Sequence, residues 1–66
     1  MSEVKLSPVS AYVKEDQLGR LVGGVFLRGK LVSQPQAYPQ ETRAQFIDRV
    51  VGICAEVMQL VETFEN

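Results

Sequence analysis

Side chains that could carry out chemistry are few in this chain. Its 66 residues include no histidine and one cysteine, Cys54. A structural zinc ion needs about four cysteine or histidine ligands, so we expect no metal and no cofactor. The sequence has neither a Gly-rich phosphate loop nor a G-x-S-x-G motif. Glu15 and Asp16 are adjacent carboxylates in a predicted turn, where both are solvated and do not form a matched acid–base pair. The sequence therefore predicts that the protein is not an enzyme.

Cys54 is the one nucleophile of note, and its surroundings predict a structural role. It lies within an apolar run, and its neighbours four residues away on a helix are Val50 and Met58. A reactive thiol needs exposure and a nearby positive charge, which this pattern does not supply. We expect Cys54 to be buried and to pack as a small apolar side chain.

Three basic residues, Arg20, Arg28 and Lys30, lie at or near a predicted hairpin and could contact phosphate. Tyr12 or Phe26 could then stack on a base. The sequence pI is about 5.2, however, and three charges fall short of the basic surface of most nucleic-acid-binding domains. We therefore expect nucleic acid not to be a partner. The alternative function is weak nucleic-acid binding through the basic hairpin side of a dimer.

The strands that would position these residues are indicated by alternation of apolar and polar side chains. Residues 9–14, "VSAYVK", alternate with a period of two, as in a half-buried strand. The following "EDQLG" favours a turn. Residues 1–8 are short and polar and end at Pro8, so we expect them to be frayed.

Two further strands are predicted at 20–27, "RLVGGVFL", and 30–33, "KLVS", joined by a two-residue turn at Arg28-Gly29. This turn would pair Leu27 with Lys30, Phe26 with Leu31 and Val25 with Val32. Gly23-Gly24 has two interpretations. It is either a turn between shorter strands or a bulge or bend within one long strand, and the β-branched and aromatic flanks favour the second.

Residues 33–40 contain two prolines and are predicted to be a connector, because a residue before proline avoids helical backbone. A helix over 41–65 follows. It begins either with Pro39 in the first turn, followed by Glu41, or with Thr42 as the N-cap and Gln45 three residues later as a capping box. The two possibilities differ by about one turn.

The apolar face of the predicted helix covers about half of its circumference, more than the stripe of about 100° that rests on a core. Three short strands would leave part of this face uncovered, and contiguous apolar surface of that kind marks an interface. We assign Ile53 and Leu60 to a partner and Ile47, Cys54 and Val61 to the sheet, or the reverse. The complete predicted partner interface is Phe46, Ile53, Val57, Leu60 and Phe64.

Together these patterns predict one α+β domain over residues 1–66: a three-stranded antiparallel β-meander followed by a long C-terminal amphipathic helix packed on the sheet. A core this small needs additional stabilisation from a disulfide, a metal or oligomerisation. One cysteine excludes a disulfide within the chain and no metal site is predicted, so oligomerisation is the remaining source. The leading hypothesis is a non-enzymatic protein-interaction module, either a homodimer or an accessory subunit of a larger partner. No secretory signal or membrane-spanning stretch is recognisable, so we expect a cytoplasmic protein.

Overall fold

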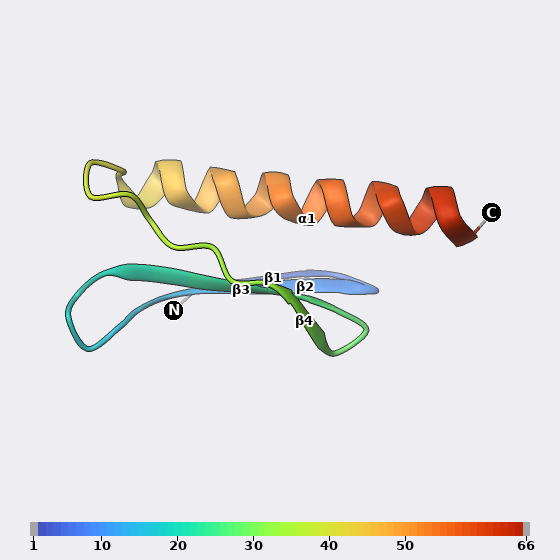
Figure 1. Cartoon of the computed structure of the whole chain (residues 1–66), viewed down its shortest axis with the longest axis horizontal. Helices are drawn as coiled ribbons and strands as arrows, with labels where there is room; N and C mark the ends of the chain where they lie inside the picture. Colours follow the sequence, from blue (N-terminus) through green and yellow to red (C-terminus); the bar gives the residue numbers. More distant parts are fainter. Residues whose placement is uncertain (1, 66) are drawn as a thin grey trace.

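The computed structural model describes residues 2–65, which form an antiparallel sheet and one helix. The strands are β1 (Ser2–Leu6), β2 (Val9–Glu15), β3 (Leu21–Leu27) and β4 (Lys30–Ser33), and the helix is α1 (Arg43–Glu65). The strands lie in the order β1-β2-β3-β4, each paired with the next. Helix α1 covers one face of the sheet, mainly over β2 and β3, and leaves the other face uncovered (Figure 1). The α+β class and the C-terminal helix are confirmed.

The sheet has four strands, and the prediction of three was wrong because β1 was expected to be frayed. Strand β1 pairs with β2 along its whole length, from Ser2 opposite Val13 to Leu6 opposite Val9. Pro8 does not interrupt this hairpin, because it lies in the turn, after a cis Ser7–Pro8 peptide bond. Proline has no N–H to donate to a ladder, so a turn is one of the few places in a hairpin that accepts it.

Gly23 and Gly24 lie within one continuous strand, which excludes a turn at this position. Both pair with β2 in regular register, so the strand is continuous as favoured, but no bulge interrupts its pairing with β2 at these glycines. A Cβ on Gly23 would lie 3.5 Å from Cζ of Phe46 and 3.0 Å from the carbonyl oxygen of Tyr12. A Cβ on Gly24 would lie 2.6 Å from Cε1 of Tyr12. The two glycines therefore let an aromatic ring approach each face of β3 closely.

The predicted hairpin turn at Arg28-Gly29 is confirmed, with positive φ angles of 51° and 83°, as a two-residue hairpin turn of type I′ requires. Two of the three predicted pairs are present, Phe26 with Leu31 and Leu27 with Lys30. The third differs, because Val25 pairs with Ser33 across a β-bulge. The extra residue of the bulge is Val32, which the predicted register placed opposite Val25.

Helix α1 begins with a capping box, the second of the two predicted starts. The backbone N–H of Gln45 donates to Oγ1 of Thr42 at 3.1 Å, and the backbone N–H of Thr42 donates to Oε1 of Gln45 at 2.9 Å. Pro39 therefore lies in the connector, before the helix. Val22 forms an isolated bridge with Gln36, so the connector runs beside β3 after β4 has ended.

The core lies between α1 and the centre of the sheet. Cys54 is fully buried there, as predicted, and burial raises the pKa of its thiol. The buried apolar residues are Val9, Ala11, Val13, Val25, Phe46, Val50 and Cys54.

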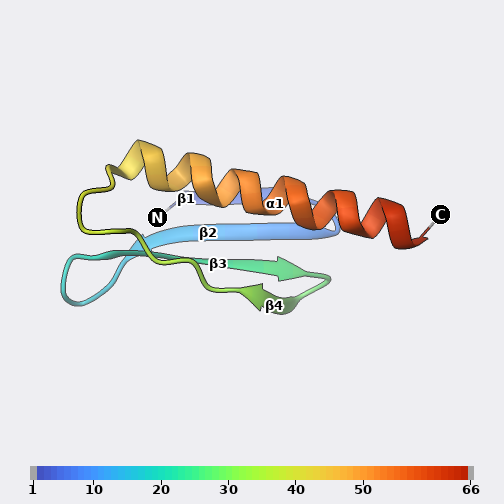
Figure 2. The same ribbon diagram turned by 45° about the horizontal axis from the view of Figure 1, so that its top comes forward.

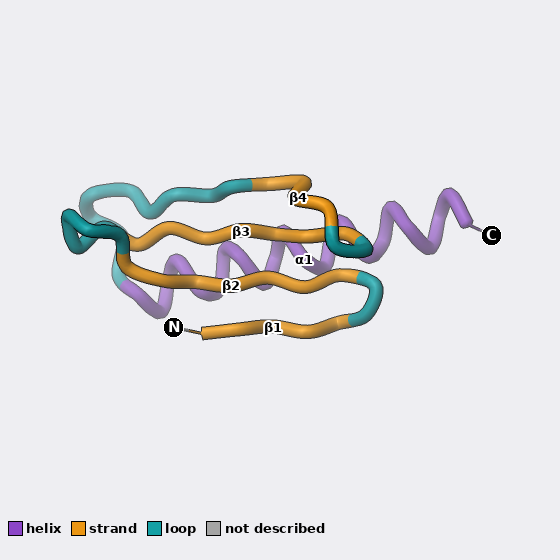
Figure 3. The backbone as a smooth tube through the Cα atoms, turned by 90° about the horizontal axis from the view of Figure 1, so that it is seen from below, coloured by secondary structure: helices purple, strands orange, loops and turns teal. Residues whose placement is uncertain are grey.

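Helix α1 is longer than the strands beneath it. Its 23 residues span about 34 Å, whereas the seven residues each of β2 and β3 span about 23 Å. The difference of about 11 Å corresponds to about seven helical residues, or two turns. The C-terminal end of the helix projects past the end of the sheet in the turned view and in the view from below (Figures 2 and 3). These two turns, residues 59–65, are called the overhanging end.

Candidate interaction surfaces

The overhanging end carries the most exposed apolar side chains of α1. Phe64 is 82% exposed and Leu60 is 56% exposed, whereas Phe46, Val50 and Cys54 nearer the start of the helix are buried. The exposed apolar surface of α1 is therefore concentrated at its C-terminal end, and Val51, at 40% exposed, is the one large apolar side chain exposed earlier in the helix.

Leu60 and Phe64 border an apolar groove between the end of α1 and the β3–β4 hairpin. Its volume is about 490 Å³. Leu27 and the bulged Val32 line the hairpin side, and Val57 and Val61 line the helix side. Arg28 is the one charged residue in the lining. The bulge at Val32 supplies apolar surface here, because Val32 is 49% exposed and lies at the groove.

The predicted partner residues divide into two groups. Leu60 and Phe64 are exposed at the groove, and Val57 lines it while packing against the core. Ile53 is half-buried and packs against the core. Phe46 must be corrected, because its side chain is 0% exposed and fills the space beside Gly23, where no partner reaches it.

The residues assigned to the sheet-facing flank also differ among themselves. Cys54 is buried and Ile47 packs against the core, which agrees with the assignment. Val61 is half-buried and lines the groove, across from Leu27 and Val32 of the hairpin. Among these apolar residues, the degree of burial therefore falls from the middle of the helix toward its C-terminal end.

The chain exposes more surface than a compact protein of its size. A compact monomer of 7.4 kDa has about 4,200 Å² of accessible surface, whereas this chain has 4761 Å². Its radius of gyration is 12.2 Å, against about 10.8 Å for a compact domain of this length. The overhanging end contributes to both differences, since it projects from the sheet along the longest axis (Figure 1).

The three basic residues predicted at the hairpin do not form one cluster. Arg28 lies in the β3–β4 turn and Lys30 directly follows it, but Arg20 lies at the other end of β3, about 23 Å away along the strand. Arg20 pairs there with Asp16 at 3.0 Å. A backbone N–H of Arg20 also donates to Asp16 and, as the main cause, holds the pKa of that carboxyl below its usual value.

A further polar cluster, which the sequence did not predict, fixes the connector to the helix. The Arg49 guanidinium donates to both carboxylate oxygens of Glu41 at 3.0 Å and also to the carbonyl oxygen of Gln36. It lies 4.8 Å from the centroid of the Tyr38 ring and 5.2 Å from that of Phe46. The hydrogen bonds from Arg49 are the main cause that lowers the pKa of Glu41, and the guanidinium and the carboxylate satisfy one another. This arrangement is structural.

Comparison with known proteins gives no assignment: no family model, curated protein or solved structure matches the chain. Among residues 2–65, no group of three His, Cys, Asp or Glu side chains is placed to hold a metal ion. The one described helix is not apolar enough over its length to cross a membrane. The interaction surfaces must therefore be interpreted from their own chemistry.

Proposed function

We propose that the protein is a non-enzymatic interaction module that forms a homodimer through the overhanging end of α1. One observation carries this proposal: an exposed apolar projection, Leu60 and Phe64, borders an apolar groove on the same chain. A two-fold contact requires a single surface that is complementary to itself. Projection and groove together provide such a surface, since the side chains of each copy enter the groove of the other.

The excess exposed surface of the whole chain is of the same order as the area that one partner contributes to a small dimer interface. The lower limit for stable interfaces is about 1,200 Å² in total, or about 600 Å² from each chain. This is close to the excess of roughly 550 Å² that the chain exposes over a compact monomer. Dimerisation would cover apolar surface that an isolated chain leaves in water.

One acidic and one basic residue lie near the two parts of the proposed contact. Glu56 lies beside Leu60 on the flank away from the groove, and Arg28 lies at the hairpin edge of the groove. When Leu60 enters the groove of the second copy, Glu56 of one chain approaches the hairpin of the other. Opposite charges at the rim of an interface favour the correct register and speed association, while contributing little to affinity.

The test is the association state of the wild-type chain and of Leu60→Lys, measured by size exclusion with light scattering over the micromolar range. We expect a wild-type dimer and a Leu60→Lys monomer, because the substitution places a charge in the apolar contact. The melting temperature of the wild type should rise with concentration, and that of the variant should not.

Val51→Lys is the matched control, since Val51 is an exposed apolar residue of the same helix that does not line the groove. It should remain dimeric. A wild-type chain that is monomeric at high micromolar concentration and melts independently of concentration overturns the homodimer. Docking onto a different protein would then be the remaining use of the groove.

A further inference from the structure

The face of the sheet opposite α1 is uncovered, and it has a distinct composition (Figure 3). Cross-strand register places two rows of side chains on it. One row contains Lys5, Ser10, Phe26 and Leu31, and the next contains Glu3, Tyr12 and Gly24. Four strands therefore contribute to one surface, called the open face.

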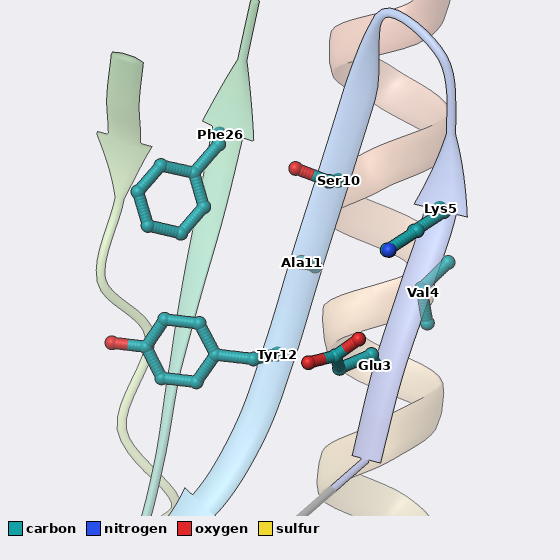
Figure 4. A pocket seen from close by; sticks show the side chains of 7 residues that line it. All are labelled: Glu3, Val4, Lys5, Ser10, Ala11, Tyr12 and Phe26. Atoms are coloured by element: carbon teal, nitrogen blue, oxygen red, sulfur yellow. The ribbon is translucent and has the colours of Figure 1, made fainter. Parts of the chain in front are cut away.

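Two aromatic rings form the centre of the open face. The centroids of Tyr12 and Phe26 are 6.0 Å apart, and their planes are inclined by 36° (Figure 4). Tyr12 extends across β3, where its ring occupies the space that a side chain at position 24 would fill. Glycine at 24 thus allows the ring to lie down on the sheet, which leaves its opposite side directed outward.

Lysines flank the two rings. Nζ of Lys14 lies 5.5 Å from the Tyr12 centroid, and Lys5 belongs to the row of Phe26. Glu3 is the one acidic residue in the two rows. Arg28 lies in the turn that begins two residues beyond Phe26, and Lys30 directly follows that turn.

Acidic groups are concentrated on the other side of the molecule. Asp48, Glu56 and Glu62 are exposed on α1. Both arginines of the helix are paired with carboxylates, Arg43 with Glu15 at 3.4 Å and Arg49 with Glu41 at 3.0 Å. The formal net charge of -1 therefore conceals a separation, with basic groups at the open face and acidic groups on the exposed side of the helix. The overall pI is a poor guide to the potential at either surface.

The shape of the open face selects among ligands. The depression beside Tyr12 and Phe26 has a volume of about 210 Å³, below the range of roughly 300–1,000 Å³ typical of small-molecule pockets (Figure 4). An open surface with outward aromatic rings and nearby lysines instead suits a linear polyanion that carries flat apolar groups. Single-stranded nucleic acid has this chemistry, because its bases stack on aromatic rings and its phosphates contact lysine.

We propose that the open face binds single-stranded nucleic acid, with bases stacked on Tyr12 and Phe26 and the backbone near Lys5 and Lys14. One chain holds the complete face, so the proposal is independent of dimerisation. It also differs from the basic hairpin considered in the sequence, because Arg20 lies apart and the two rings provide the main contact. Binding is expected to be weak and strongly dependent on salt, since few phosphates are contacted.

The test is fluorescence anisotropy of a labelled oligothymidylate and a labelled oligouridylate, each of roughly 10 nucleotides, within the range of single-strand site sizes. Titration with the full chain at low salt should give saturable binding to single strands and weaker binding to a duplex of equal length. Phe26→Leu and Tyr12→Leu should each weaken binding about tenfold, the loss expected for one stacked base. Tyr38→Leu is the control, because Tyr38 is an exposed ring on the connector, away from the open face.

Two further measurements make the result decisive. Lys5→Gln with Lys14→Gln should reduce the slope of log affinity against log salt by about 1.4, or about 0.7 for each phosphate that a lysine no longer neutralises. Phe64→Ala should bind the same short oligonucleotide with the same affinity as the wild type, whether the variant is a monomer or a dimer. The proposal is overturned if no anisotropy change occurs up to about 100 μM protein, a concentration that detects even non-specific binding at low salt. It is also overturned if folded Phe26→Leu and Tyr12→Leu both bind like the wild type.

Discussion

Phe64→Ala provides the strongest test of the proposed dimer, because Phe64 contributes little to the isolated chain. Its side chain is 82% exposed, so truncation removes few contacts within the monomer. Full burial of a phenylalanine side chain is worth about 1.5–3 kcal/mol. About four-fifths of this value, roughly 2 kcal/mol, remains available to a partner.

The two-fold axis doubles the effect, because each dimer contains two such contacts. Removing both costs about 4 kcal/mol, which corresponds to an increase in the dimer Kd of nearly a thousandfold. This is an upper value, since the docked ring need not become fully buried. We therefore expect an increase of between one hundred and one thousandfold, on the order of 3–4 kcal/mol.

Sedimentation equilibrium over a range of loading concentrations measures this Kd directly. Val51→Ala is the matched control, since it removes apolar surface from the same helix outside the groove. Circular dichroism should show the same helix content in both variants and in the wild type. If Phe64→Ala and the wild type share one Kd, the ring does not enter the contact and the two-fold arrangement is wrong.

Three further predictions concern the fold itself. Cys54→Ala should lower the free energy of unfolding by about 1–2 kcal/mol through loss of buried volume, and a thiol reagent should label the folded wild type only slowly. Gly52→Ala should stabilise the chain by about 1 kcal/mol in chemical denaturation, because the new methyl group meets no atom within 4 Å and alanine favours helix. Glu41→Gln should destabilise the protein at neutral pH, and the difference in stability between variant and wild type should vanish on acidification. The pKa of Glu41 is lowered in the folded protein, chiefly by the hydrogen bonds from Arg49. The ionised carboxylate therefore stabilises the fold above the ordinary carboxyl pKa, and this contribution is lost as the pH falls through the lowered pKa. Thermal melts across pH 2–7 that show a constant difference would contradict this last prediction.

The parts of the fold that the sequence predicted correctly depend on local periodicity. A helix of six turns repeats its apolar spacing often enough to be recognised, and the capping box at Thr42 and Gln45 is a short-range signal. The turn at Arg28-Gly29 is equally local. Strand β1 was missed because it is short, with two apolar residues, Val4 and Leu6, and because Pro8 was interpreted as the end of order when it occupies a turn.

The candidate sites were harder to predict, because they depend on relations between elements. Periodicity gives the width of an apolar face, but the exposure of Leu60 and Phe64 follows from a helix that is longer than the strands. The contribution of Val32 to the groove depends on a bulge that shifts the register by one residue. The hydrogen bonds between Glu41 and Arg49 join residues eight positions apart across the start of the helix, and no periodicity marks that pair.

The two proposed contacts occupy different parts of the molecule, and this separation follows from one property of the fold. A single helix can cover only one face of a four-stranded sheet, so the second face must meet solvent or a ligand. The lysines of the open face are well solvated in water, and its two rings can stack on a ligand. The same helix is longer than the sheet, so its end remains uncovered in the single chain, where the proposed dimer would cover it. In the proposed dimer the contact involves the end of α1 and the groove, whereas the open face lies on the opposite side of the sheet from α1. Binding at the open face and dimerisation are therefore compatible, and a substitution that abolishes one should leave the other intact.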